Sequence, residues 1–359
     1  MSEPDDNLMD VDAMQSPEPE TGEMPEAEET PEQQEAPQPP SEPTQTPMEP
    51  PPLPPKEEKK RSRRKLGDLD LAVAKIGFIG AGEMAQCIIE GLINHGKIPP
   101  SNIFVAAPTN KNLEKLKTFG VKTSKRSIDI FSKFDCDVIF VCIHGAPIKN
   151  CYDAERPRAF TVNFIPYMRH PLYILSLVWG VKLHEIKACL LNPDHPEKYS
   201  IEMHRIMMNA ACAYGLGICA IDKEPDSPAV TAPVRNLLSS IAKLEYLSGE
   251  QMDAACAIGG GGLAFAYYFI NAMADGAFKV SLDRDTSIKF AAKTVHCATQ
   301  CLLESGKHPD ELRDFVSTPS GAAIYGIHVL DKADVASGVI AAVEAAHQRA
   351  FVLAAKAED

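Results

Sequence analysis

The chain has 359 residues, of which 49 are acidic and 36 are basic, and its formal net charge is −13. The acidic excess belongs to residues 1–55, which hold 15 Asp or Glu and no Lys or Arg, whereas residues 56–359 hold 34 acidic and 36 basic side chains. No uninterrupted apolar run reaches the roughly 18 residues of a membrane span. The start, MSEPDDNLMD, matches neither a secretory signal nor a mitochondrial presequence. We therefore expect a cytoplasmic protein that is not secreted and does not bind a membrane.

Residues 1–66 are predicted to form a disordered, acidic, proline-rich tail. The first 55 residues contain 15 of the 29 prolines, and they cannot bury enough apolar surface to offset the entropy of ordering. The PPPLPP stretch at 50–55 is typical of a solvated spacer, or of a segment that binds a protein partner through polyproline II. A basic cluster follows, which is typical of a hinge or of a nuclear-import signal: Lys59, Lys60, Arg61, Arg63, Arg64 and Lys65. The neutral remainder does not indicate nucleic-acid binding.

The ten cysteines are scattered through apolar surroundings, and none forms a CxxC pair. This spacing predicts neither a metal site nor a thioredoxin-type motif. Cys297 and Cys301 are four residues apart, which would place them on one face of a helix. We expect them, like the others, to be buried free thiols.

A glycine-rich turn follows the first predicted strand, Lys75–Ile79, and precedes a segment with helical periodicity. The sequence GAGEMA has the GxGxxA spacing of a dinucleotide-binding turn in its expected strand–turn–helix context. Gly80 would permit the tight turn, Gly82 the close approach of a pyrophosphate, and Ala85 the packing of helix on strand. The positive end of the helix would face the phosphates. The predicted cofactor-binding residues here are Ile79, Gly80, Ala81, Gly82, Glu83 and Met84.

The second predicted strand, Asn102–Ala106, is not followed by the acidic residue that would bind an adenosine ribose. The chain instead continues with Ala107, Pro108, Thr109, Asn110 and Lys111. Without a carboxylate, a 2′-phosphate meets no repulsion, and hydroxyl, amide and ammonium groups can bind it. Positive charge is also available at Lys125 and Arg126, next to Ser127. The sequence therefore favours NADP(H) over NAD(H), with Ala107, Thr109 and Asn110 among the cofactor-binding residues.

Two further apolar runs, Asp137–Ile143 and Tyr173–Trp179, are predicted to be buried parallel strands. The carboxyl ends of such strands face the ligand crevice. We therefore expect residues at these ends to lie near the cofactor: Cys142, Ile143, His144 and Trp179.

The sequence changes character near residue 249. Alanine-rich helical periodicity covers Met252–Val280, Asp285–Glu304 and Val335–Ala355. The predicted fold is an α/β Rossmann-type domain with a doubly wound parallel sheet over residues 67–248, followed by an all-α domain over residues 249–359.

Four segments resemble pyrroline-5-carboxylate reductases. They are GFIGAGEMA at 77–85, ADGA at 274–277, ESGKHPDELRDFVSTPSGAAIYGIHVLD at 304–331 and AAVEAA at 341–346. The resemblance extends from about Lys75 to the C-terminus. The chain also resembles a divergent branch of the family, the NADP-dependent oxidoreductase domain-containing proteins. It implies an all-α dimerisation domain, a homodimer or a higher ring, and hydride transfer from NAD(P)H to a small cyclic imino acid, giving proline.

The resemblance also implies a substrate site at the turn before a late helix. In the family this turn binds the substrate carboxylate through hydroxyl and backbone N–H groups, which agrees with the affinity of a helix N-terminus for anions. The corresponding residues here are Ser317, Thr318, Ser320, Gly321 and Ala322. A purely structural alternative is that Ser317 or Thr318 caps the helix, with Pro319 at its first position.

Several positions around this implied pocket depart from the family pattern. Ala323 stands where the family usually has Thr, Gly259–Leu263 replace SGSGP, and Val178 with Trp179 replace Ala-Ala near the nicotinamide. The MPNTP segment becomes Met207–Ala211 and keeps Asn209. Val178 and Asn209 are expected to contact the cofactor by this resemblance. The departures leave two alternatives to proline-forming reduction: a non-catalytic NADP-binding regulatory or scaffold protein, and a reductase of a different small imino or keto acid.

Overall fold

The computed structural model describes residues 65–143, 167–190, 200–223 and 230–355. The expected disorder of the tail, nearly all of the basic cluster, and His144 lie outside these residues. The predicted fold class is confirmed: an α/β region with a mainly parallel sheet is followed by a region in which every regular element described is helical.

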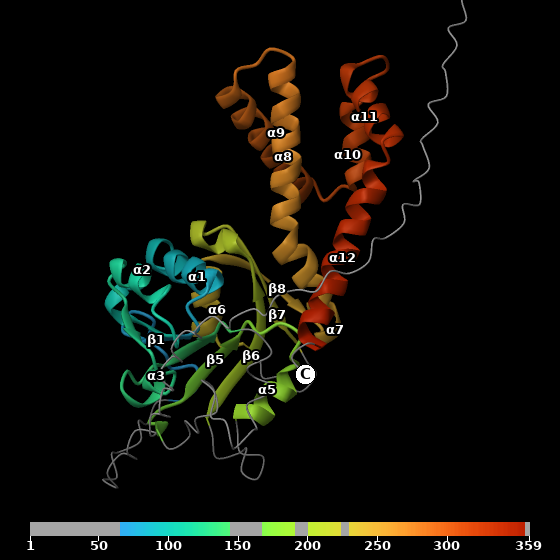
Figure 1. Cartoon of the computed structure of the whole chain (residues 1–359). Coiled ribbons are helices and arrows are strands. Elements are labelled where there is room, and N and C mark those ends of the chain that lie inside the picture. The colour runs from blue at the N-terminus through green and yellow to red at the C-terminus, as the bar shows by residue number, and fades with distance from the viewer. Residues whose placement is uncertain (1–64, 144–166, 191–199, 224–229, 356–359) are drawn as a thin grey trace, which may run out of the picture. The chain divides into compact units, whose positions relative to one another are not determined.

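The sheet has eight strands in the order β3-β2-β1-β4-β5-β6-β7-β8 (Figure 1). The order reverses between β1 and β4, which is the hallmark of a doubly wound sheet. Neighbouring strands are parallel except β6 and β7, which are antiparallel. The strands are β1 Ile76–Ile79, β2 Ile103–Ala106, β3 Lys122–Ser124, β4 Val138–Val141, β5 Leu172–Ser176, β6 Ile201–Met208, β7 Gly217–Asp222 and β8 Ala242–Leu247.

Helices cover both faces of the sheet, which is why strands β1, β2, β4 and β5 are buried along their whole length. One apolar core packs the helices α1 Glu83–Asn94, α2 Leu113–Thr118 and α6 Ala232–Ser239 on one face. A second core packs α3 Asp129–Ser132 and α5 Leu183–Leu190 on the other. Two short 3₁₀ helices, η1 Pro100–Asn102 and η5 Ala210–Tyr214, lie in the connections.

The helical segment starts with α7 Gly249–Ala255 and continues through a π-helical turn, η6 Cys256–Gly261, into α8 Gly262–Lys279. The single helix expected over Met252–Val280 is therefore interrupted at its run of glycines. Helix α8 packs against α9 Arg284–Ser305, and α12 Val335–Ala355 packs against α11 Ala322–Lys332 and the π-turn (Figure 1). Helix α10 Pro309–Val316 precedes α11.

The helical segment leaves large apolar side chains exposed, including Tyr268 at 76%, Phe290 at 64% and Phe315 at 81%. Within the described residues one stretch, Gly249–Lys279, is long and apolar enough to cross a membrane by length and composition alone, and 11% of its apolar window is buried. Cys297 and Cys301 are exposed on α9. The expectation that they are buried is therefore wrong for a single subunit, because no element among the described residues covers that face.

Candidate functional site

The turn after β1 has the geometry that its glycines predict. Gly80 has a φ of +103°, and a Cβ there would lie 2.2 Å from the carbonyl oxygen of Cys142, so only glycine fits. A Cβ at Gly82 would meet no atom within 4 Å. No side chain caps α1 at Gly82, so the first N–H groups of the helix remain available to an anion. This arrangement fits a pyrophosphate group.

Backbone hydrogen bonds connect the carboxyl ends of five neighbouring strands. Ala107 N donates to Ser124 O at 3.1 Å and Gly80 N to Ala106 O at 2.8 Å. Cys142 N donates to Ile79 O at 2.8 Å and Leu177 N to Val141 O at 2.9 Å. The residues that follow β1, β2, β3, β4 and β5 therefore share one edge of the sheet, as the crevice prediction requires.

The residues expected to bind a 2′-phosphate lie in two adjacent loops of this edge. Thr109, Asn110 and Lys111 are exposed after β2, and Lys125 is exposed after β3. Arg126 is less available, because its Nε lies 3.8 Å from Asp129 Oδ1. Ala107 is buried at 7% exposure, so it contributes backbone rather than side-chain surface. The structure thus brings the predicted donors together.

The residues expected at the ends of β4 and β5 differ in exposure. Desolvation by burial raises the pKa of the Cys142 thiol, so this group is neutral and is not a nucleophile. Ile143 is partly buried. Val178 is 1% exposed and packs in the core, whereas the next side chain, Trp179, is 38% exposed. Of these two neighbours, only Trp179 therefore offers a substantial side-chain surface to a ligand.

Asn209, at the end of β6, connects the sheet to the helical segment. Its Nδ2 donates to Gly259 O in the π-turn at 3.1 Å, and its Oδ1 accepts from Ile218 N at 3.3 Å. The side chain is 8% exposed. Its amide therefore holds the π-turn in place, a role that the sequence did not reveal.

The predicted carboxylate-binding turn joins α10 to α11. Ser317 Oγ donates to Arg313 O at 2.7 Å, and Gly321 N donates to Thr318 O at 2.9 Å. Ser320 has a φ of +60°, an uncommon conformation for a non-glycine residue. The helix begins at Ala322 with Gly321 as N-cap and no side-chain cap. The alternative of capping by Ser317 or Thr318 is therefore wrong, and no side chain in the described part of the chain caps this helix start.

The α10–α11 turn and the glycine turn make no direct polar contact in the part of the chain that the structure describes. Thr318, Ser320 and Ala322 are exposed. Among the hydrogen bonds and ion pairs of the described residues, none joins Ser317–Ala322 to Gly80–Met84. The α10–α11 turn therefore presents its groups outward from this chain.

Sequence reasoning missed two ionic contacts. Arg205 Nη2 on β6 bonds Asp253 Oδ1 on α7 at 2.5 Å, with side chains 4% and 26% exposed. This pair adds a second connection between sheet and helical segment. Nothing in the local sequence indicates it, because its partners are far apart along the chain.

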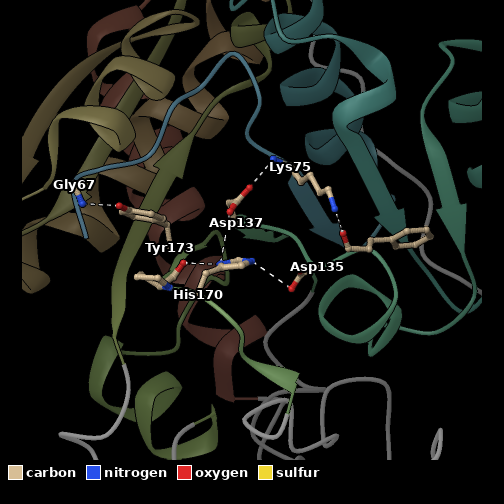
Figure 2. Close-up of polar contacts among 8 residues, drawn as sticks. Gly67, Lys75, Asp135, Asp137, His170 and Tyr173 are labelled. Carbon is tan, nitrogen blue, oxygen red and sulfur yellow. Dashed lines mark hydrogen bonds and ion pairs between the residues drawn. The ribbon is translucent and has the colours of Figure 1, made fainter. Parts of the chain in front are cut away.

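The second contact is a histidine cluster at the amino ends of β1, β4 and β5, the opposite edge from the glycine turn. Figure 2 shows the His170 ring between Asp135 and Asp137. Nε2 of His170 lies 3.4 Å from Asp135 Oδ1, and its Nδ1 lies 3.6 Å from Asp137 Oδ1. Lys75 N donates to Asp137 Oδ2 at 2.8 Å, and Gly67 N donates to the Tyr173 hydroxyl at 2.7 Å.

The His170 cluster has shifted pKa values. Burial by itself lowers the pKa of His170, but the bond to Asp135, the Pro171 carbonyl and the charge of Asp137 together raise it. Burial likewise opposes ionisation of Asp135, yet its bond to His170 and nearby positive charge lower its pKa. The cluster is a structural ion pair that anchors the chain leading into β1.

Two family models match the chain. The model described as pyrroline-5-carboxylate reductase dimerisation matches residues 249–353, and the one described as NADP oxidoreductase coenzyme F420-dependent matches residues 75–160. The first match supports a homo-oligomer and accounts for the exposed apolar side chains of the helical segment.

Curated relatives match over most of the chain. Pyrroline-5-carboxylate reductase 3 of Xenopus laevis is 31% identical over 281 residues, which cover 78% of this chain and 96% of that protein. The protein of the same name from Danio rerio is 31% identical over 287 residues, covering 80% and 94%. Among solved structures, Plasmodium falciparum pyrroline carboxylate reductase with NADP bound has a TM-score of 0.64 at 22% identity, covering 79% of this chain and 100% of that one.

Proposed function

Because the chain belongs to the pyrroline-5-carboxylate reductase family, we propose that it is an NADP(H)-dependent reductase that delivers hydride to a small cyclic imino acid, in a reaction of the proline-forming type. The observation that carries this proposal is the turn at Gly80–Gly82. It combines a backbone that only glycine permits, open space at Gly82 and an uncapped helix start.

The residues of the glycine turn would hold the pyrophosphate of the cofactor. Backbone N–H groups at the start of α1 would bind its oxygens, and Thr109, Asn110 and Lys111 would bind the 2′-phosphate of NADP(H). The exposed Lys125 in the adjacent loop supports this preference by adding positive charge. When bound, NADPH supplies the hydride, and the protein orients the acceptor and excludes water.

The turn at Ser317–Ala322 would bind the substrate carboxylate. The hydroxyls of Thr318 and Ser320 and the N–H group of Ala322 provide donors at a helix N-terminus, whereas the Ser317 hydroxyl and the Gly321 N–H would have to exchange their bonds to Arg313 O and Thr318 O for the ligand. Since this turn faces outward from its own subunit, we propose that it completes the site of a second subunit. The functional unit is then at least a homodimer, with a higher ring as the alternative.

A second candidate function is NADP(H) binding without catalysis, for regulation or assembly. Ala323 favours it, because it removes a hydroxyl from the helix start that the family resemblance places beside the imine nitrogen. The loss of one preorganised donor typically costs about 10²–10³ in rate. The cofactor turn would then be kept while turnover is lost.

Calorimetry and a turnover assay separate the two functions. The full chain should bind NADPH with micromolar or better affinity, and NADPH oxidation should proceed with pyrroline-5-carboxylate or another cyclic imino acid. Small keto acids belong in the same panel. Binding without turnover on any acceptor would favour the non-catalytic function, and absence of NADPH binding would reject both.

A further inference from the structure

Trp179 is the only tryptophan of the chain, and it lies three residues beyond Ser176, the last residue of β5. Its neighbour Val178 is in the core, whereas the indole is 38% exposed. The backbone bond from Leu177 N to Val141 O holds the end of β5 beside the end of β4. The Trp179 side chain therefore lies at the ligand-binding edge of the sheet, outside the core.

The Trp179 ring packs against the π-turn at Gly260, a position without a side chain. A Cβ at Gly260 would lie 3.1 Å from Trp179 Cζ2 and 3.2 Å from Cη2, so a side chain there would require the ring to shift by a few tenths of an ångström. The turn is itself fixed by the bond from Asn209 to Gly259. The benzene half of the indole thus has a built seat, and π-turns of this kind are frequent at functional sites.

The strand order places this ring on one side of the cofactor crevice. The adenosine ribose of a bound dinucleotide is read at the end of β2, and the pyrophosphate lies at the turn after β1. The nicotinamide must then extend the other way, over β4 and β5. Trp179 follows β5, so it lies on the nicotinamide side of the crevice.

We infer that Trp179, seated on Gly260, forms the wall of the acceptor space beside the nicotinamide and restricts the acceptor to small, flat cyclic imines. This inference rests on the proposed function, because it names the acceptor class of that site. A large aromatic ring on a glycine seat fills volume that a smaller side chain would leave open. It excludes acceptors with bulky ring substituents while presenting a flat apolar face to an unsubstituted ring.

Fluorescence tests the position of the ring without catalysis. Oxidised nicotinamide quenches indole emission on contact, and NADP⁺ lacks the absorption band through which NADPH quenches at a distance. Because Trp179 is the only tryptophan, its emission should fall when the full chain binds NADP⁺. It should stay unchanged with 2′-phospho-ADP-ribose, which carries the same phosphates and no nicotinamide.

The outcomes separate the two proposals. If calorimetry shows that NADP⁺ binds while the emission does not change, the role of Trp179 is wrong and the proposed function stands. Equal quenching by both nucleotides also contradicts it, since the effect would not come from the nicotinamide. If neither nucleotide binds, the proposed function fails and the inference fails with it.

Acceptor specificity provides the second measurement. Trp179→Ala should raise kcat/KM for a ring-substituted cyclic imine relative to the unsubstituted one by at least about tenfold, and Trp179→Phe should change the ratio less. Gly260→Ala should alter the ratio as well, because it displaces the ring. Tyr246→Ala is the matched control, since that exposed aromatic residue lies on β8 at the sheet edge. An unchanged ratio in Trp179→Ala would overturn the inference.

Discussion

The sheet region buries its apolar side chains, whereas the helical segment exposes many of its own. Strands β1, β2, β4 and β5 are completely buried between two layers of helices. Helices α8 to α12, by contrast, bury few residues and expose Tyr268, Phe290 and Phe315. The difference teaches that the described sheet region buries its apolar side chains within one chain, whereas the helical segment leaves them exposed, which the match to a dimerisation model explains by a second subunit. The match to a dimerisation model supports the same explanation for the exposed apolar side chains of α8, such as Tyr268.

The largest expected effect comes from breaking the subunit contact of the helical segment. Phe290→Asp should convert the oligomer to monomer, because a charge buried in an interface without a partner weakens association by about 4 kcal/mol. Size-exclusion chromatography with light scattering measures this. Lys293→Asp, an exposed position on the same helix, is the control and should leave the oligomer intact. If the wild-type chain is already a monomer, the explanation of the exposed helical segment by a second subunit is wrong.

Variants of the glycine turn test whether this part of the sheet region is shaped for a ligand. Gly80→Ala should lower the free energy of unfolding by about 3 kcal/mol, because its Cβ would overlap the Cys142 carbonyl and its φ is positive. Gly82→Ala should leave stability unchanged, since its Cβ meets no protein atom, and should weaken NADPH binding at least tenfold. Urea denaturation and calorimetry measure the two effects. Equal stability losses in both variants would show that the turn is not shaped for a ligand.

The ion pair between Arg205 and Asp253 tests how the two regions are held together. Arg205→Ala should destabilise the chain by about 2 kcal/mol, less than for a fully buried pair because Asp253 is a quarter exposed. The double variant Arg205→Met with Asp253→Leu should recover most of the loss, since it leaves no unpaired charge. Urea midpoints check this, and a double variant as unstable as the single one would refute the explanation.

The His170 cluster should produce the smallest effect, below about 1 kcal/mol. Because the folded pKa of His170 is raised, its contribution is fully present below the unfolded value of about 6.5 and is lost as pH rises through the folded pKa. The lowered pKa of Asp135 acts in the opposite sense, so its contribution is lost in strong acid. Wild type should therefore lose stability relative to His170→Gln as the pH rises above about 6.5. Parallel stability curves for the two proteins would refute the ion pair.

The sequence predicted features that depend on neighbouring residues. It predicts the turn at Gly80–Ala85, the strands over Lys75–Ile79 and Asp137–Ile143, and the start of the helical region. Turn chemistry and hydrophobic periodicity act over a few residues, so they can be read without the fold. The loops at Thr109–Lys111 and Lys125 were also predicted as donors, and parallel pairing of β2 with β3 places them side by side.

Only the tertiary structure decided the contacts between distant segments. The bond from Asn209 to Gly259 appears only in the fold, and the cofactor contact expected of Asn209 stays a prediction. Trp179 and Gly260 lie against each other although they are far apart in the chain. The helix after Ser317 starts later than its hydroxyl and proline residues indicate, and Cys297 and Cys301 are exposed. Local sequence sets which element forms, but which surfaces meet depends on the packing of whole elements.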